Sequence, residues 1–381
     1  MIYLDNAATT RPKAEVVQAM LPYLMEDYGN PSSVYQMGNT GKAAVSMARQ
    51  KAADLLHVPA TSIYFTSGGS ESDNWVLMDC FHRALLQGQK HPHIITSSIE
   101  HPAILNTCHY LEELGAEVTY LPVDPYGLVD PKDLLSAIRP ETVLISIMTA
   151  NNEIGTIEPI RELGRIAREH GILFHSDAVQ AFGQIPLDLS ELPVDFLSAS
   201  GHKIYGPKGI GLLYIREGIP VRSLIHGGDQ ERNRRAGTEN VPGIVGFGKA
   251  CELAEKTLTE RMEEETKLRD HLTKRLLSEI PGCRLNGDPK KRLPNNVNVI
   301  FPGIRGESIL ISLDMMGIEA SSGSACTAGS LDPSHVLLAL GLSEEEALGE
   351  LRLTLSDTTT KEEIDQCVDA LKEIVSRLRK Y

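Results

Sequence analysis

The sequence has no apolar run long enough to cross a membrane as a helix. Its first residues, Met1-Ile2-Tyr3-Leu4-Asp5, lack the basic start and the apolar core of a signal peptide. Positive charge is not in excess either, because 51 acidic residues outnumber 37 basic ones and the formal net charge is −14. We therefore expect a cytoplasmic protein with no direct nucleic-acid partner and no membrane contact.

Paired cysteines are also missing. The six cysteines form no C-x-x-C pair and have no neighbouring histidine at the spacing of metal ligands; they are Cys80, Cys108, Cys251, Cys283, Cys326 and Cys367. The sequence therefore predicts no disulfide framework and no metal site. Most of the cysteines lie in helical or apolar patterns, which are typical of buried and inert thiols.

Cys326 has different surroundings. It lies in a run of small residues, 320–330, with no apolar periodicity that would bury it. A thiol on a flexible, wettable loop, about 320–332, can ionise and travel, and a nucleophile needs both properties. The alternative is an incidental exposed cysteine.

The overall composition is ordinary for a globular protein. Of the 381 residues, 41% are hydrophobic and 23% are charged. Short apolar runs alternate with helical segments, a pattern that predicts an α/β fold whose mainly parallel sheet is covered on both faces. The expected strands are 63–66, 93–97, 117–123, 143–148, 172–175, 196–198 and 211–215.

A long helical region, 244–278, connects this part to a second one. We expect a large domain over 14–259 and a small C-terminal α+β domain over 260–381, with residues 1–13 packing on the small domain. Its expected elements are strands at 296–301 and 351–355 and a closing helix at 361–379.

Polar residues follow several of the expected strands. They are Ser70 after the first, Glu100-His101 after the second, Asn151-Asn152-Glu153 after the fourth, and Asp177 with Gln180 after the fifth. The carboxyl ends of parallel strands meet at one edge of a sheet, so we expect these side chains to converge.

Two glycine-rich turns are candidates for ligand binding. Ser67 to Ser72 follows a strand and opens a helix, which offers backbone N–H groups and a positive helix end to a phosphate. Ser198 to Gly211 places Ser200, His202 and Lys203 after another strand, which suits a Schiff-base lysine holding pyridoxal 5'-phosphate. The alternatives are a plain β-to-α turn for the first and a turn with solvated lysines for the second.

Arg352 is unusual because it stands inside an apolar, strand-like run. A guanidinium in a half-buried strand requires a carboxylate, and either a protein side chain or a substrate carboxylate would serve.

With these motifs in place, the chain resembles the cysteine desulfurases of the iron–sulfur-assembly and nitrogen-fixation type. These are fold-type I pyridoxal 5'-phosphate enzymes of the class V aminotransferase group. The resemblance runs over essentially the whole chain. It is carried by the segments 4–10, 28–33, 100–101, 150–156, 177–180, 200–209, 235–240 and 322–326.

The resemblance implies a fold with a large domain built on a seven-stranded sheet and a role for each matching residue. Lys203 would hold the cofactor, Asp177 would face its ring nitrogen, Gln180 would bond its phenolic oxygen and His101 would stack on the ring. The phosphate would be bound by Gly69, Ser70, Ser200 and His202, with Thr238 supplied by the partner subunit of a homodimer. Asn152 and Arg352 would bind the substrate carboxylate, and Cys326 would attack the substrate sulfur.

The implied reaction converts L-cysteine to L-alanine and leaves a persulfide on Cys326 for a sulfur-acceptor protein, either a scaffold for iron–sulfur clusters or a tRNA-thiolating enzyme. A selenocysteine lyase or an aminotransferase on the same fold is the alternative within this class of enzyme. A non-catalytic assembly partner is the alternative from another class.

Three positions depart from the family pattern. Ser70 stands where threonine is usual, which keeps the hydroxyl. Asp73 replaces a common asparagine and is expected to add a negative charge near the phosphate turn. Asp357 stands where an aromatic or basic residue is common, a difference that concerns the affinity for the substrate and not the binding of the cofactor.

Overall fold

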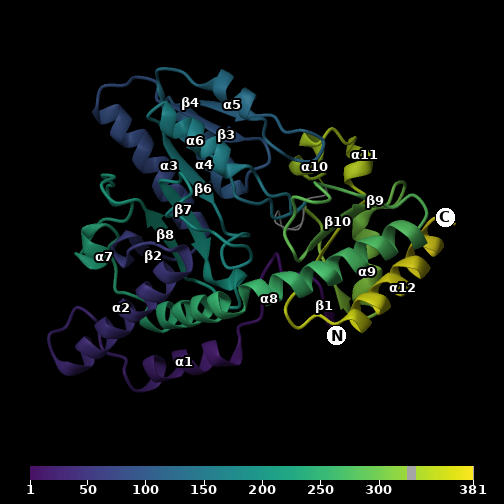
Figure 1. Ribbon diagram of the computed structural model, residues 1–381, viewed down its shortest axis with the longest axis horizontal. Coiled ribbons are helices and arrows are strands. Elements are labelled where there is room, and N and C mark those ends of the chain that lie inside the picture. Colours follow the sequence, from purple (N-terminus) through teal and green to yellow (C-terminus); the bar gives the residue numbers. More distant parts are fainter. Residues whose placement is uncertain (324–331, 381) are drawn as a thin grey trace.

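The large lobe is built on a seven-stranded sheet. The computed structural model describes residues 1–323 and 332–380 and has two lobes (Figure 1). The strands are β2 (Ile63–Thr66), β3 (His93–Ser97), β4 (Glu117–Leu121), β5 (Thr142–Ser146), β6 (Leu173–Asp177), β7 (Phe196–Ser200) and β8 (Gly211–Ile215). Their order is β2-β8-β7-β6-β5-β3-β4, and only β8 runs antiparallel to its neighbours. The prediction of a mainly parallel seven-stranded α/β sheet is confirmed.

Helices cover both faces of this sheet because neighbouring strand residues point to opposite faces. Tyr64 belongs to a buried cluster that includes residues of α3 (Gly69–Leu86) and α4 (Pro102–Glu113), whereas Phe65 belongs to a cluster on the other face that includes residues of α2 (Gln36–Leu56) and α6 (Ile160–Glu169). The remaining helical elements of this lobe are α1 (Ala14–Met25), η1 (Ala60–Ser62), α5 (Pro131–Ala137), η2 (Gly201–Lys203) and α7 (Gln230–Asn233).

One continuous helix, α8 (Val241–Glu279), joins the lobes (Figure 1). Phe247 lies in the core beside the large sheet, and Leu272 lies in the core of the small lobe. The domain boundary predicted between residues 259 and 260 therefore falls inside a helix that belongs to both lobes.

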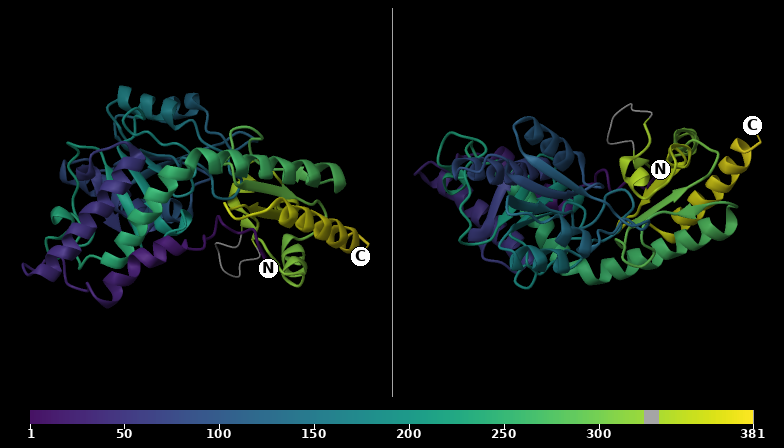
Figure 2. Two further views of the ribbon diagram at one scale, coloured as in Figure 1. Left: turned by 60° about the horizontal axis from the view of Figure 1, so that its bottom comes forward. Right: turned by 90° about the horizontal axis from the view of Figure 1, so that it is seen from above.

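The small lobe contains an antiparallel sheet of β12 (Glu350–Thr354), β10 (Asn296–Ile300) and β9 (Arg284–Leu285). Its helices are α9 (Gly306–Asp314), α10 (His335–Ala339), α11 (Glu344–Ala347) and α12 (Lys361–Leu378). The N-terminal strand β1 (Ile2–Tyr3) pairs with β11 (Ile318–Glu319), so the chain starts on the small lobe and then crosses to α1 (Figure 2).

Helix α2 begins at Gln36 although its first two turns contain two glycines. Gly38 and Gly41 weaken the helical signal there. The folded chain needs them, because a β-carbon at Gly38 would lie 2.4 Å from the carbonyl oxygen of Ser33 and one at Gly41 would lie 3.2 Å from that of Gly29. Tertiary packing thus overrides the local propensity.

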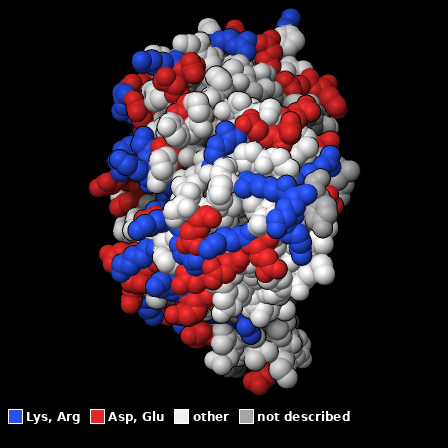
Figure 3. Space-filling view, turned by 90° about the vertical axis from the view of Figure 1, so that its right-hand side faces the viewer, with Lys and Arg blue, Asp and Glu red and all other residues white. Residues whose placement is uncertain are grey.

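Acidic and basic side chains are interspersed on the face formed by the small lobe (Figure 3). Arg275 of α8, for example, bonds Glu279 on its own helix and Asp365 and Asp369 of α12. Within residues 1–323 and 332–380, no helix is long and apolar enough to cross a membrane.

Candidate active site

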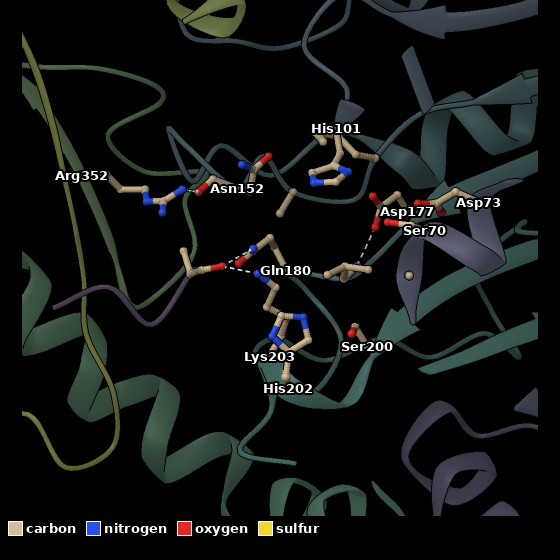
Figure 4. A pocket seen from close by; sticks show the side chains of 15 residues that line it. Ser70, Asp73, His101, Asn152, Asp177, Gln180, Ser200, His202, Lys203 and Arg352 are labelled. Atoms are coloured by element: carbon tan, nitrogen blue, oxygen red, sulfur yellow. Dashed lines mark hydrogen bonds between the residues drawn. The ribbon is translucent and has the colours of Figure 1, made fainter. Parts of the chain in front are cut away.

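A cavity of about 200 Å³ lies at the carboxyl ends of the large-lobe strands (Figure 4). It brings together ten of the twelve residues predicted to form the site. They are Gly69, Ser70, His101, Asn152, Asp177, Gln180, Ser200, His202, Lys203 and Arg352. The expected convergence at the strand ends is present for Ser70, His101, Asn152, Asp177 and Gln180. Glu100, Asn151 and Glu153 are buried and do not line the cavity, and Arg352 is contributed by the small lobe.

Lys203 lies at the end of η2, directly after β7. Its Nζ donates hydrogen bonds to the carbonyl oxygens of Ala7 and Ala8, and Gln180 Nε2 donates to the Ala7 carbonyl at 3.0 Å. These bonds attach the N-terminal segment to the cavity wall. No role for Ala7 could be predicted from the sequence, since a contact made by a backbone carbonyl does not depend on the side chain.

Asp177 is the last residue of β6, and its carboxylate is 6% exposed. Burial raises its pKa, while nearby His101, the amide of Val179 and Lys203 favour the charged form. Oδ1 accepts a hydrogen bond from the Val179 amide at 2.9 Å. A buried carboxylate whose charge is costly in isolation is suited to pair with a protonated ring nitrogen.

His101 faces Asp177 from the start of α4 (Figure 4). Its Nδ1 accepts a hydrogen bond from the amide of Ala103 at 3.1 Å, so the neutral ring carries its proton on Nε2. Burial lowers the pKa of this imidazole, and Lys203 lowers it further. The ring is therefore an uncharged flat surface at the cavity wall.

The phosphate end of the cavity is formed by the start of α3. The helix begins at Gly69 after Gly68, and no side chain caps its first N–H groups. A β-carbon at Gly69 would lie 2.5 Å from Val179 Cγ2, so only glycine leaves this approach open. With Ser70 and Ser200 beside it, this helix end has the N–H donors and the dipole that bind an anion.

His202 stands at the same end and is neutral, because burial followed by Lys203 and Lys208 lowers its pKa to about 4. Its Nδ1 lies 3.2 Å from Thr9 Oγ1. It can therefore donate a hydrogen bond to a phosphate without carrying a charge of its own.

Asp73 does line the cavity, but the negative charge expected from the sequence is suppressed. The carboxyl group is 1% exposed, and burial together with Asp177 raises its pKa well above the ordinary value. Its Oδ1 lies 3.6 Å from Nε2 of His175, a buried ring whose pKa falls to about 3. Asp73 thus favours the neutral form, in which it resembles the asparagine it replaces.

Arg352 has the carboxylate partner that its buried position requires. The side chain is 1% exposed, with Nη2 2.9 Å from Asp5 Oδ1 and Nη1 donating to the carbonyl of Asn152 at 3.2 Å. Asp5 belongs to a segment that carries the family resemblance, yet sequence reasoning gave it no role. A substrate carboxylate at Arg352 would share the guanidinium with Asp5.

The departure at Asp357 concerns another part of the molecule. Asp357 Oδ2 lies 2.6 Å from Lys13 Nζ, and the Asp357 amide donates to the hydroxyl of Tyr205 at 3.1 Å. It is absent from the lining of the cavity described above. Its charge stabilises the attachment of the N-terminal segment and does not face the substrate.

Two predicted site residues are not in the cavity. Thr238 is exposed on the loop between α7 and α8 and does not line the described cavity. Arg235 on the same loop bonds Glu71 in the first turn of α3, with distances of 2.8 and 3.1 Å. Cys326 lies outside the described residues.

The other five cysteines are buried, as the sequence predicted for most of them. Burial raises the pKa of Cys80, Cys108, Cys283 and Cys367 to about 12. No group of three or more potential metal ligands occurs in the part of the chain that the structure describes.

A lysine amine, a buried carboxylate and an uncapped helix start around one cavity define a pyridoxal 5'-phosphate enzyme. The donor set fits this cofactor at each of its ends: Asp177 for the ring nitrogen, the α3 start for the phosphate and Lys203 for the aldehyde carbon. The sequence model of the class-V aminotransferase family matches residues 2–367, and the chain belongs to that family.

Comparison with individual proteins shows which members of this family the chain is similar to. The chain is 56% identical over 378 residues to the cysteine desulfurase IscS of Methanosarcina thermophila, covering 99% of this chain and 93% of that one. A solved NifS-like protein superposes with a TM-score of 0.92 at 41% identity, covering 99% of this chain and 100% of the other. A structure of SspA in complex with cysteine has a TM-score of 0.84 at 37% identity, covering 94% and 100% of the two chains.

Proposed function

We propose that this protein is a cysteine desulfurase that converts L-cysteine to L-alanine and carries the released sulfur as a persulfide on Cys326. The observation that carries the proposal is one cavity that holds Lys203 and Asp177 from the large lobe and Arg352 from the small lobe. The relatives that share more than half of the residues over the whole chain are named as cysteine desulfurases. A solved relative contains cysteine.

The chain's own residues have separate tasks in this reaction. Arg352 and Asn152 bind and orient the substrate carboxylate, which fixes the amino group toward Lys203. The Lys203 amine takes the proton from the substrate Cα and can return a proton on the same side. When bound, pyridoxal 5'-phosphate supplies an electron sink for the carbon atoms of the substrate.

The sulfur step balances without an external oxidant. The Cys326 thiolate attacks the substrate sulfur, so one S–S bond forms and one C–S bond breaks. The electron pair of the broken bond stays on carbon, which takes up one proton to become the methyl group of alanine. One L-cysteine and one enzyme thiol therefore give one L-alanine and one enzyme persulfide, which an acceptor protein receives.

The experiment that tests the proposal mixes purified protein, reconstituted with the cofactor, with L-cysteine and a thiol reductant. Alanine and sulfide are expected in equal amounts, because the reductant releases the sulfur atom from the persulfide. Without the reductant or an acceptor, turnover should stop after about one alanine per subunit, since Cys326 can carry one sulfur. If wild-type protein forms no alanine, the proposed function is wrong.

The working form is proposed to be a homodimer in which Thr238 of one subunit reaches the phosphate site of the other. Two features support this. Helix α1 exposes a set of apolar side chains that a second copy would cover, namely Val17, Leu21, Leu24 and Met25. Thr238 is exposed on a loop that Arg235 bonds to the start of α3, where the phosphate site lies.

Light scattering is expected to give a mass near twice the 41.7 kDa of the chain. Thr238→Ala should weaken cofactor binding about tenfold by removing one hydrogen bond to the phosphate. Glu239→Ala, next to it on the same loop, is the matched control and should leave the affinity within about twofold. A monomer in solution, or a Thr238→Ala variant with unchanged cofactor affinity, would contradict this assignment.

A further inference from the structure

Two buried carboxylates stand beside the residues that bind the substrate. Glu153 directly follows Asn152 and is 4% exposed, whereas Glu350 begins β12, two residues before Arg352, and is 2% exposed. Neither residue lines the cavity, so the reaction described above does not use them. Both hold residues at the two ends of the chain segment that contains Cys326.

The first of these ends is attached to β12. The backbone of Ser321 pairs with that of Arg352 through bonds of 3.2 and 2.7 Å. The amide of Gly323 donates to Glu350 Oε2 at 2.7 Å. The chain leading into segment 324–331 is therefore bound to the same strand that presents the substrate-binding guanidinium.

The second end is attached to Glu153. Ser334 Oγ donates to Glu153 Oε2 at 2.5 Å and accepts hydrogen bonds from the amides of Val336 and Leu337, which caps α10. The chain leaving the segment is therefore fixed next to Asn152.

The two carboxylates are close to each other. A β-carbon at Gly323 would overlap Glu153 Oε2 and would lie 2.7 Å from Glu350 Oε2, so both oxygens border one point of the backbone. Asn298 Nδ2 donates both to the carbonyl of Glu153 and to Glu350 Oε1. Among the described residues, Arg352 is the basic group that acts on both carboxyl groups.

Two buried carboxyl groups can lie side by side at low cost only if they are not both ionised. Burial, followed by repulsion from Glu153, raises the pKa of Glu350 to about 8, and burial raises that of Glu153 as well. Near neutral pH the pair therefore retains a proton, which allows two carboxyl groups to lie side by side.

We propose that Glu153 and Glu350 are positioning residues for sulfur transfer, which hold Gly323 and Ser334 beside the substrate-binding residues so that Cys326 reaches the substrate sulfur. This role deepens the proposed function and rests on it. It also links the two ends of the segment to Asn152 and Arg352, the residues that bind the substrate carboxylate.

Replacement of Glu350 tests this role. Glu350→Ala removes the acceptor for the Gly323 amide and should slow persulfide formation on Cys326 at least about tenfold in a single turnover. Glu350→Gln keeps an acceptor oxygen and should recover the rate to within about threefold. The KM for L-cysteine and the visible spectrum of the bound cofactor should stay unchanged, which a general loss of structure would not allow.

Glu158→Gln is the matched control. Glu158 is also buried, with a pKa raised to about 8, but it accepts a bond from the Val129 amide and does not line the cavity. Its rate of persulfide formation should equal that of wild type. If Glu350→Ala and Glu158→Gln behave alike, the inference is wrong.

The pH dependence gives a second measure. As pH rises through about 8, the retained proton is lost and two anions face each other, so the hold on Gly323 weakens. The rate of persulfide formation in wild type, divided by the rate in Glu350→Gln, should therefore fall over this range. Dividing the two rates removes the pH dependence of the Cys326 thiol, which is common to both proteins. A ratio that does not change with pH contradicts the retention of a proton by this pair.

Alkylation of Cys326 by iodoacetamide, followed by mass spectrometry, needs no substrate. It should be at least about threefold faster in Glu350→Ala than in wild type, because one end of the segment is released. If wild type forms no alanine but alkylation responds in this way, the proposed function fails, while the attachment of Gly323 by Glu350 is supported. If Glu350→Ala does not fold, Gly323→Ala replaces it, and unchanged alkylation and sulfur transfer there would overturn the inference.

Discussion

Lys203→Ala is expected to abolish cysteine desulfurase activity, with a loss of at least about 10³-fold in kcat/KM. In the proposed reaction the lysine amine holds the cofactor and moves the Cα proton, and no other described residue that lines the cavity is a lysine. The variant should also lose the visible absorption of the wild-type protein, which is expected to be yellow. Absorption spectra and alanine release measure the two effects.

Lys208→Ala is the matched control for this experiment. Lys208 lies five residues further along the same turn and is exposed. It should retain the absorption band and activity within about threefold, since it is not part of the cavity lining. Equal losses in both variants would mean that the turn acts as a unit and that Lys203 has no special role.

Cys326→Ser should lower sulfide release from L-cysteine by at least about 100-fold, because a hydroxyl group cannot accept sulfur as a persulfide. Cofactor binding should be unaffected, so the protein stays yellow and its spectrum still changes when L-cysteine is added. An aminotransferase on the same fold has no need of this thiol. Full turnover by Cys326→Ser would therefore favour an aminotransferase over a desulfurase.

Cys283→Ser is the corresponding control, since Cys283 is 8% exposed and lies in the small-lobe core with a pKa raised to about 12. Its activity should match that of wild type once the folded fraction is taken into account. Mass spectrometry after one turnover should find the additional sulfur on the peptide that contains Cys326. Sulfur on one of the buried cysteines would contradict the assignment.

The cofactor half of the site could be predicted from the sequence because its residues follow apolar runs. Asp177 and Lys203 each come at or just after the end of a buried strand, and Gly69 opens a helix. Strand ends and glycine turns are local features, and the parallel arrangement then brings them to one edge of the sheet. Nine predicted residues of the large lobe therefore meet in one cavity although they are far apart in the chain, and Arg352 joins them from the small lobe.

The electrostatic state of the site could not be predicted in this way. The expected charge on Asp73 is suppressed because the packed sheet and helix exclude water from it. Asp357 forms an ion pair with Lys13. Its difference from the family pattern therefore does not alter the cavity. Both outcomes depend on burial and on neighbours that are distant in sequence.

The alternation of strands and helices, the lysine turn and the phosphate turn could be predicted from local sequence, because each depends on residues within a few positions of one another. Tertiary structure alone decided that Asp5 pairs with Arg352 across 347 residues, and that Glu153 and Glu350 meet beside Gly323. These contacts exist because the small lobe packs against the strand ends of the large one. The spacing of residues along the sequence does not predict which distant carboxylate lies beside which guanidinium.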